Sequence, residues 1–218
     1  RINIKLTTDT ETEINSQSSS VNKKNIDDFF GNLDELSNDD CVFLSGNIIP
    51  GMEDEDFVNI AKKVREKGAR LVVDSNKEMV LDTLKYKPFA VKPNEFELGE
   101  MFGVKVDTVE DIAKYARKLQ EMGAINVLVS RGSKGAILFT GEGEVFCANV
   151  ARGKVVSTIA AGDSMLAMFV KYDESKDYKL SLQYASAAGG ATSFSAGVGK
   201  RELIDELSVQ IKVNKCDL

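Results

Sequence analysis

The chain has 218 residues, of which 43% are hydrophobic, and it carries a formal net charge of -6 with a pI near 5.0. Lysines and arginines are interspersed with acidic residues and no apolar run is long enough to span a bilayer, so the sequence predicts neither a nucleic-acid partner nor a membrane-bound protein. A globular protein that binds a small molecule is the expected class.

The opening segment, residues 1–17, predicts an antiparallel β-hairpin outside the main domain. Polar and apolar residues alternate, a short turn follows, and a second alternating run returns. The period of two places Arg1, Asn3 and Lys5 on one face, where two cations and an amide suit an anionic ligand, although a solvated face fits the same pattern. The opposite face is apolar, so a homodimer formed through this hairpin is a further hypothesis.

From residue 18 to 218, short apolar runs alternate with amphipathic segments, which indicates one core domain. The runs typical of buried parallel strands are 41–45, 70–74, 89–92 and 126–130. The segments with helical periodicity are 22–36, 54–67, 95–102 and 108–122. Gly68 and Gly123 stand where the C-terminal caps of two of these helices are expected. Strands that alternate with helices predict a doubly wound, mainly parallel α/β sheet.

Polar residues follow each of the four expected parallel strands. They are Ser45–Asn47, Asp74–Asn76, Lys92–Asn94 and Ser130–Gly132. In sheets of this class, ligands bind beyond the carboxyl ends of the strands. We therefore expect these residues to lie at the binding site.

The last third of the chain adds antiparallel strands and helices. Runs at 136–139 and 144–148, joined by turn residues, predict a hairpin that extends the sheet. Helices are expected over 163–171, 180–193 and 200–207.

Small residues precede the first of these helices. Ala160, Ala161 and Gly162 have little or no side chain, so their amide groups can face phosphate oxygens at the positive end of the helix. The carboxylate of Asp163 would then lie beside the bound group. An acidic residue at a helix start is also a common cap, so this run alone leaves both interpretations open.

The cysteine and histidine counts restrict the chemistry. Cys41, Cys147 and Cys216 lie far apart without a pairing motif, so the sequence predicts neither a disulfide framework nor a thiolate zinc site. A reducing compartment, the cytoplasm, is expected. No histidine is present, which excludes Ser-His-Asp and Cys-His nucleophilic catalysis. Acid-base chemistry then falls to Asp, Glu, Lys or Tyr.

Five motifs in order resemble the ribokinase-like (PfkB-type) carbohydrate kinases, and within them the branch of 1-phosphofructokinase and tagatose-6-phosphate kinase. The motifs are Arg1–Lys5, Leu44–Gly51, Lys92–Leu98, Val129–Gly135 and Ser157–Ser164. The likeness covers nearly the whole chain, but the early part of the family's pattern, with its sugar-binding Asp, is absent.

The resemblance implies an ATP-dependent, magnesium-requiring kinase that phosphorylates a hydroxyl of fructose 1-phosphate or tagatose 6-phosphate. It aligns Asp163 with the general base and residues 160–162 with the hole that holds the transferring phosphoryl group. Asn94 and Glu97 would organise magnesium, largely through water. For Glu97, a carboxylate stabilised by the helix dipole is the alternative.

The resemblance also assigns residues to the two ligands. The nucleotide-binding residues would be Ser130, Gly132, Gly135, Lys92 and Ala188, of which Ala188 fits helix packing equally well. The substrate-binding residues would be Arg1, Asn3, Ser45 and Asn47. The guanidinium of Arg1 suits a phosphate group, which favours an already phosphorylated sugar.

One departure from the family motif concerns the phosphoryl hole. Ala160 stands where relatives usually have glycine, and a methyl group there disfavours a backbone with positive φ. A non-catalytic chain, either a pseudokinase or a fragment that binds nucleotide or phosphosugar, is therefore the alternative hypothesis. The retained Asp163, Asn94 and Glu97 favour the enzyme.

Overall fold

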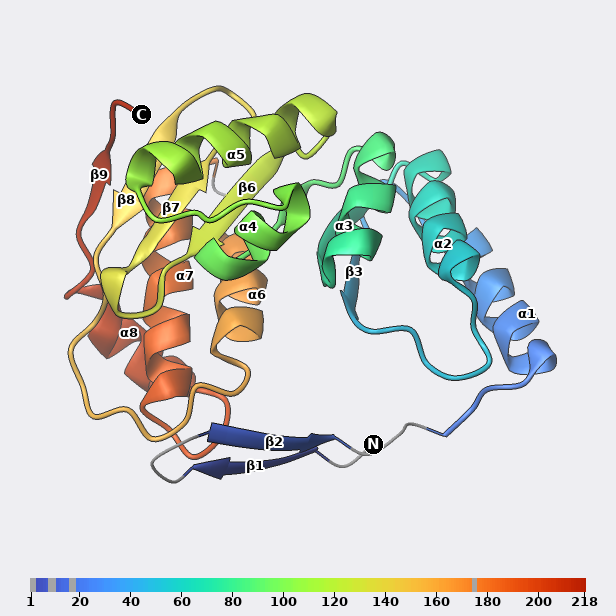
Figure 1. Ribbon diagram of the computed structural model, residues 1–218, viewed down its shortest axis with the longest axis horizontal. Helices are drawn as coiled ribbons and strands as arrows, with labels where there is room; N and C mark the ends of the chain where they lie inside the picture. The colour runs from blue at the N-terminus through green and yellow to red at the C-terminus, as the bar shows by residue number, and fades with distance from the viewer. Residues whose placement is uncertain (1–2, 8–10, 16–18, 174–175) are drawn as a thin grey trace.

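The computed structural model describes residues 3–7, 11–15, 19–173 and 176–218. One sheet of seven strands forms its centre, in the order β3-β4-β5-β6-β7-β8-β9 (Figure 1). The strands are β3 Cys41–Gly46, β4 Arg70–Ser75, β5 Ala90–Val91, β6 Asn126–Ser130, β7 Ala136–Phe139, β8 Val145–Ala148 and β9 Val213–Lys215. Neighbours from β3 to β6 pair in parallel, whereas β6 to β9 pair antiparallel. The predicted mainly parallel start and the antiparallel hairpin after it are both confirmed.

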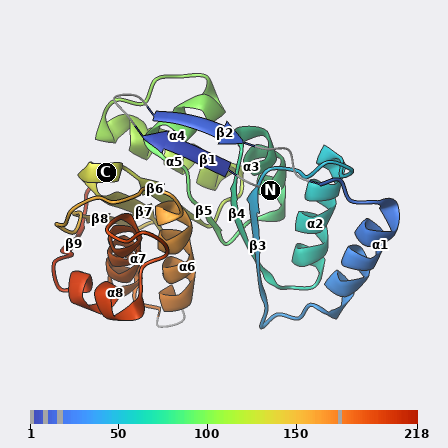
Figure 2. The same ribbon diagram turned by 90° about the horizontal axis from the view of Figure 1, so that it is seen from below.

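Helices cover both faces of this sheet. Their bounds are α1 Lys23–Asn32, α2 Asp54–Glu66, α3 Lys77–Thr83, α4 Glu95–Phe102, α5 Val109–Met122, α6 Ala161–Asp173, α7 Tyr178–Ser193 and α8 Arg201–Ser208. Figure 2 shows α4 and α5 on one side of the strands and α6, α7 and α8 on the other. The doubly wound architecture expected from the alternation of elements is therefore confirmed.

Two hydrophobic cores result from the alternation of side chains along each strand. On β4, Leu71 and Val73 pack with buried residues of α2 to α5, and Val72 between them packs with α6 to α8. On β6, Val127 belongs to the first core and Leu128 to the second. Successive side chains of a strand point to opposite faces, so strands buried on both sides read as continuous apolar runs.

Two short elements were not predicted. Helix α3 has seven residues, too few for a clear helical period, and begins after Asn76, whose side chain accepts a hydrogen bond from the Met79 amide at 3.1 Å. Strand β9 has three residues, of which two are exposed, and pairs with β8 at the sheet edge. Such elements are fixed by tertiary contacts, which local sequence patterns do not report.

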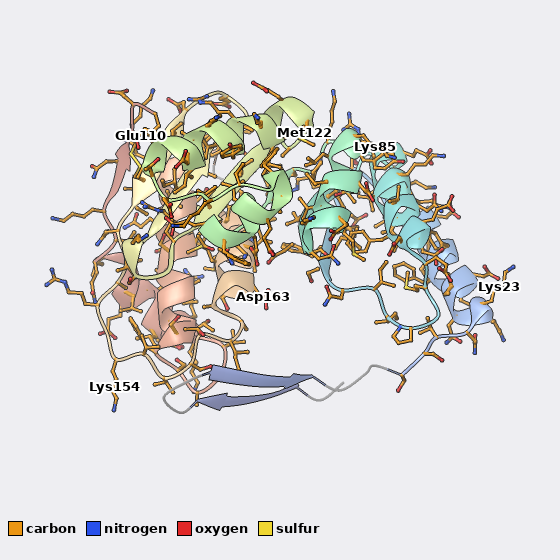
Figure 3. The ribbon with its side chains drawn as sticks, in the orientation of Figure 1. Lys23, Lys85, Glu110, Met122, Lys154 and Asp163 are labelled. Atoms are coloured by element: carbon orange, nitrogen blue, oxygen red, sulfur yellow. A yellow bond between two sulfur atoms is a disulfide. The ribbon has the colours of Figure 1, made fainter. Side chains whose placement is uncertain are left out.

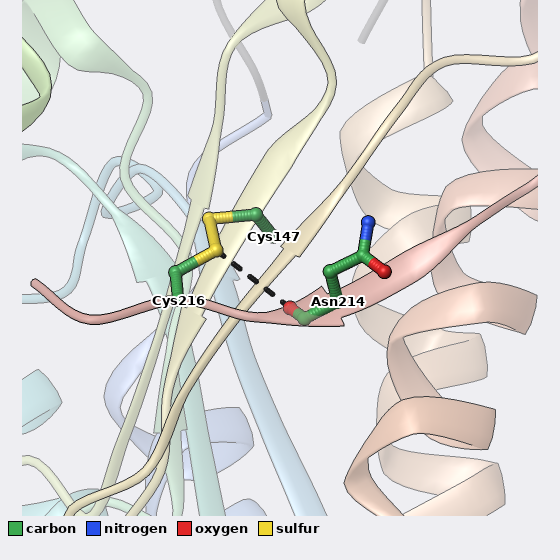
Figure 4. The surroundings of a disulfide bond; sticks show 3 residues. All are labelled: Cys147, Asn214 and Cys216. Atoms are coloured by element: carbon green, nitrogen blue, oxygen red, sulfur yellow. Dashed lines mark hydrogen bonds between the residues drawn. A yellow bond between two sulfur atoms is a disulfide. The ribbon is translucent and has the colours of Figure 1, made fainter.

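The sequence predicted no disulfide framework, yet the structure contains a disulfide. The structure joins Cys147 of β8 to Cys216, which directly follows β9, across a sequence separation of 69 residues (Figure 4). The two Cα atoms are 6.2 Å apart because the β8–β9 pairing brings the segments together, and the Cys216 amide donates to the Val145 carbonyl at 2.8 Å. Because β9 was not predicted, this pairing could not be predicted either. Cys41 is a free cysteine.

The predicted hairpin at the start of the chain is also present. Strands β1 (Asn3–Thr7) and β2 (Glu11–Asn15) pair antiparallel, with Asn3 opposite Asn15, and form a sheet of their own. In Figure 1 this hairpin lies beside the domain rather than within its layers. Arg1 falls outside the described residues. Within the described part of the chain, no helix has both the length and the apolar character needed to cross a membrane.

Candidate active site

Residues at and just beyond the carboxyl ends of β3, β4 and β5 line one cavity of about 640 Å³. We call it the acidic cavity. Its lining residues are Gly46, Asn47, Asp74, Ser75, Asn76, Lys77, Glu78, Lys92, Glu97, Glu100 and Asp163. It brings together four residues that the sequence nominated for a site: Asn47, Lys92, Glu97 and Asp163. Figure 3 shows Asp163 at the start of α6.

A buried ion pair lies in the wall of the acidic cavity. The Lys92 ammonium is 3.2 Å from a carboxylate oxygen of Asp74, and the two side chains are 8% and 19% exposed. Burial raises the pKa of Asp74, Lys92 partly offsets this rise, and the negative charges of Glu97 and Asp163 add to it. From the sequence, Asp74 was expected near the binding site but was assigned no role. Its pairing with Lys92 was not predictable, because it depends on β4 and β5 being neighbours in the sheet.

The same lysine also reaches the start of α6. A Cβ atom on Gly162 would lie 2.8 Å from the Lys92 Nζ, so the ammonium lies directly beside the Gly162 backbone. The amide groups in the first turn of a helix lack carbonyl partners within the helix and carry a partial positive charge. Lys92 therefore adds a full positive charge to the place where the helix already favours an anion.

A second cavity, of about 530 Å³, lies on the other side of this helix start. We call it the glycine-lined cavity. Its walls include Ser130 at the end of β6, Gly132 and Gly135 from the segment after it, Ala161 and Gly162 from α6, and Ser186, Gly189 and Gly190 from α7. Gly135 has a φ of 88°, and a side chain there would overlap the Ala148 carbonyl oxygen, so only glycine fits this wall. Gly162 lines the glycine-lined cavity, and the next residue in the chain, Asp163, lines the acidic cavity.

Comparison with known proteins identifies the family to which this arrangement belongs. Residues 1–203 match the family described as pfkB family carbohydrate kinase. The chain belongs to this family. The predictions of a PfkB-type fold and of a kinase are thereby confirmed.

The similar pfkB-family proteins include 1-phosphofructokinases, as the sequence motifs suggested, and kinases named for tagatose 1-phosphate rather than for tagatose 6-phosphate. A 1-phosphofructokinase of Bacillus subtilis is 38% identical over 217 residues, which are 99% of this chain and 71% of that protein. A D-tagatose-1-phosphate kinase of Bacillus licheniformis is 33% identical over 215 residues, which are 98% of this chain and 70% of that protein. A solved structure assigned as a phosphofructokinase from Staphylococcus aureus is 33% identical, with a TM-score of 0.88 over 100% of this chain and 71% of its own.

Asn94 and Glu97, the predicted magnesium residues of this pfkB-family chain, hold each other at the start of α4. The Glu97 amide donates to Asn94 Oδ1 and the Asn94 amide donates to Glu97 Oε2, each at 2.8 Å. This capping box fixes both side chains and uses only one carboxylate oxygen of Glu97, a residue that lines the acidic cavity. Among the described residues, no three His, Cys, Asp or Glu side chains gather as a metal site. A Glu97 carboxylate oriented by the capping box fits magnesium held through water, the arrangement that a strongly hydrated ion favours.

Three residues predicted to bind ligands do not lie in the cavity where the sequence analysis expected them. Ala188 is fully buried in the core between helices, because the helical period turns residues 186, 189, 190 and 193 of α7 toward the glycine-lined cavity instead. Ser45 lines a neighbouring apolar cavity of about 330 Å³, which it shares with Asn47. Lys92, expected with the nucleotide loop, lines the acidic cavity.

Ala160 has a left-handed backbone. Its φ is 60°, and its carbonyl accepts the Ser164 amide at 2.9 Å, so the hydrogen-bond ladder of α6 starts from this residue. A left-handed alanine costs about 1 to 2 kcal/mol because its Cβ approaches the following carbonyl oxygen. The sequence could flag Ala160 only as a departure from the family's glycine; the strain itself follows from the observed φ.

The substitution Ala160→Gly should therefore raise the free energy of unfolding by about 0.5 to 1 kcal/mol, since strain relief exceeds the added entropy of the unfolded chain. Urea denaturation measures this change. Lys87, with a φ of 54° at the end of a 3-10 helix, provides the matched control. Lys87→Gly should stabilise the protein by a similar amount without altering its activity, and a loss of stability in Ala160→Gly would contradict the proposed strain.

Proposed function

We propose that the chain transfers the γ-phosphate of ATP to a hydroxyl group of a phosphorylated hexose. One observation carries the proposal: the glycine-lined cavity and the acidic cavity meet at consecutive residues, Ala161, Gly162 and Asp163. A nucleotide in the first cavity and an acceptor in the second would bring the phosphoryl group and the hydroxyl to the same helix start. Phosphoryl transfer depends mainly on such positioning and on charge neutralisation.

In this proposal, each part of the helix start has a separate task. The amides of Ala160, Ala161 and Gly162 would bind the oxygens of the transferring phosphoryl group, assisted by the Lys92 ammonium. The Ala161 amide, which donates to the Thr158 carbonyl at 3.3 Å, would exchange this long hydrogen bond for a phosphoryl oxygen. The Asp163 carboxylate would accept the proton of the acceptor hydroxyl as the oxygen attacks phosphorus. Ser130, Gly132 and Gly135 are small, so they would let the nucleotide approach the backbone closely.

Magnesium, when bound, would neutralise the charge of the nucleotide phosphates. Asn94 and Glu97 would hold it through water, because their capping box keeps the Glu97 carboxylate at the wall of the acidic cavity. Asn47, which lines the same cavity, would contact the acceptor sugar. Binding of the acceptor by Arg1, Asn3 and Ser45, and homodimerisation through the hairpin, stay predictions.

Fructose 1-phosphate is the acceptor that we favour, because the Bacillus subtilis relative named 1-phosphofructokinase shares 38% of its residues with the chain. The second candidate is a tagatose phosphate. The Bacillus licheniformis relative is named for tagatose 1-phosphate rather than for the 6-phosphate that the motifs suggested.

The proposal predicts ADP release from MgATP that depends on a sugar phosphate. A coupled assay would compare fructose 1-phosphate, tagatose 1-phosphate, tagatose 6-phosphate and unphosphorylated fructose. We expect turnover with a ketohexose phosphate and little with the free sugar. Binding of ATP without turnover on any acceptor would support the non-catalytic alternative and refute the kinase.

A further inference from the structure

The acidic cavity contains more negative than positive groups. Five carboxylates line it, from Asp74, Glu78, Glu97, Glu100 and Asp163, against the ammonium groups of two lysines. A sugar phosphate brings about two further negative charges. Desolvating that phosphate near carboxylates is unfavourable unless a cation of the cavity meets it directly.

The two lysines, Lys77 and Lys92, differ in how firmly they are held. Lys92 is 8% exposed and pairs with the largely buried Asp74. Lys77 is 46% exposed, and its ammonium is 3.5 Å from a carboxylate oxygen of Glu78, which is itself 68% exposed. Exposed ion pairs of this kind contribute about 0 to 1 kcal/mol, so the Lys77 ammonium can leave Glu78 for a better anion at little cost.

The place of Lys77 in the fold separates it from the nucleotide. Lys77 begins α3 directly after β4, whereas the walls of the glycine-lined cavity start from the end of β6. The strand β5 lies between β4 and β6, so the two strand ends are about 10 Å apart. Lys92, at the end of β5, stands between them. A cation that follows β4, such as Lys77, is therefore on the acceptor's side of the phosphoryl-transfer point.

We propose that the Lys77 ammonium binds the phosphate group that the acceptor sugar already carries, and so selects a phosphorylated over a free sugar. This inference rests on the proposed kinase function. An ammonium and a phosphate monoester form charge-assisted hydrogen bonds, which are roughly twice as strong as neutral ones. Lys77 is then a specificity residue and takes no part in the chemical step.

The test compares the wild-type protein with Lys77→Met and Lys77→Arg. Lys77→Met should weaken fructose 1-phosphate binding, measured by calorimetry, by about ten to a hundredfold and raise its KM by a similar factor. The KM for MgATP should stay within about twofold, because the nucleotide site is untouched. Lys77→Arg should retain most of the affinity. The preference of kcat/KM for fructose 1-phosphate over fructose should fall with the affinity, which a merely structural defect would not produce.

Lys85→Met provides the matched control. It removes the same charge beyond the far end of α3, outside the acidic cavity, and Figure 3 shows Lys85 well away from Asp163. Unchanged sugar-phosphate affinity in Lys77→Met, or an increase in the MgATP KM alone, would overturn the inference. Absence of turnover in the wild type would refute the proposed function instead, and calorimetry would still measure whether Lys77 binds the sugar phosphate.

Discussion

The substitution Asp163→Asn is expected to reduce kcat by about a hundredfold to ten-thousandfold. Asparagine keeps the size of the side chain but cannot accept the hydroxyl proton. Asp163 lines the acidic cavity together with Lys92, in the first turn of α6 and directly after Gly162. Initial rates of ADP release with fructose 1-phosphate measure the loss, and calorimetry should show ATP binding within a few fold of the wild type.

A control for this prediction removes a carboxylate that has no place at the site. Asp82 is exposed on α3 and does not line the acidic cavity, so Asp82→Asn makes the same change in charge away from the chemistry. It should leave kcat unchanged. A kcat for Asp163→Asn within about threefold of the wild type would exclude Asp163 as the general base, since general-base catalysis contributes far more than that.

The second large effect is expected for Lys92→Met, on both activity and stability. Removing the cation beside Gly162 should lower kcat by about a hundredfold to a thousandfold, the loss typical of one missing donor to a developing anion. It also leaves Asp74 without its buried partner, which should destabilise the fold by about 3 kcal/mol near neutral pH. Steady-state kinetics and urea denaturation measure the two losses separately.

The stability loss of Lys92→Met should depend on pH in a defined direction. Burial and the nearby Glu97 and Asp163 raise the pKa of Asp74, and Lys92 is the group that opposes this rise. Without Lys92 the folded-state pKa rises further above the unfolded value, so the folded protein favours the protonated carboxyl. The deficit should therefore be largest near pH 7 and shrink as the pH falls toward about 5. A deficit that grows on acidification would contradict this explanation.

A double variant separates the two roles of Lys92. Asp74→Asn in the Lys92→Met background removes the unpaired charge, so it should restore most of the stability while leaving kcat low. Recovery of kcat together with stability would mean that Lys92 acts only by holding the cavity wall. The single variant Asp74→Asn shows how much of the wild-type stability depends on the ion pair itself.

The fold was largely predictable because its elements carry local signals. Helix α4 and strand β6 match the expected ranges, since apolar periodicity, a capping residue at Asn94 and a buried run at 126–130 all act over a few residues. The convergence of polar residues after the parallel strands followed from the class of sheet. Short elements such as α3 and β9 depend on their neighbours, which explains why they were missed.

The sequence by itself determined the class of protein and the residue types of the site: a kinase motif ending in Asp163, an Asn94-Glu97 pair and small residues for close approach. These features depend on residues that lie close together in the sequence. The tertiary structure alone decided that Lys92 pairs with Asp74 and lies beside Gly162, that Ala188 faces the core, and that Cys147 meets Cys216. Each of these depends on which strands and helix faces are neighbours, and that is fixed by packing across the whole sheet rather than by any single segment.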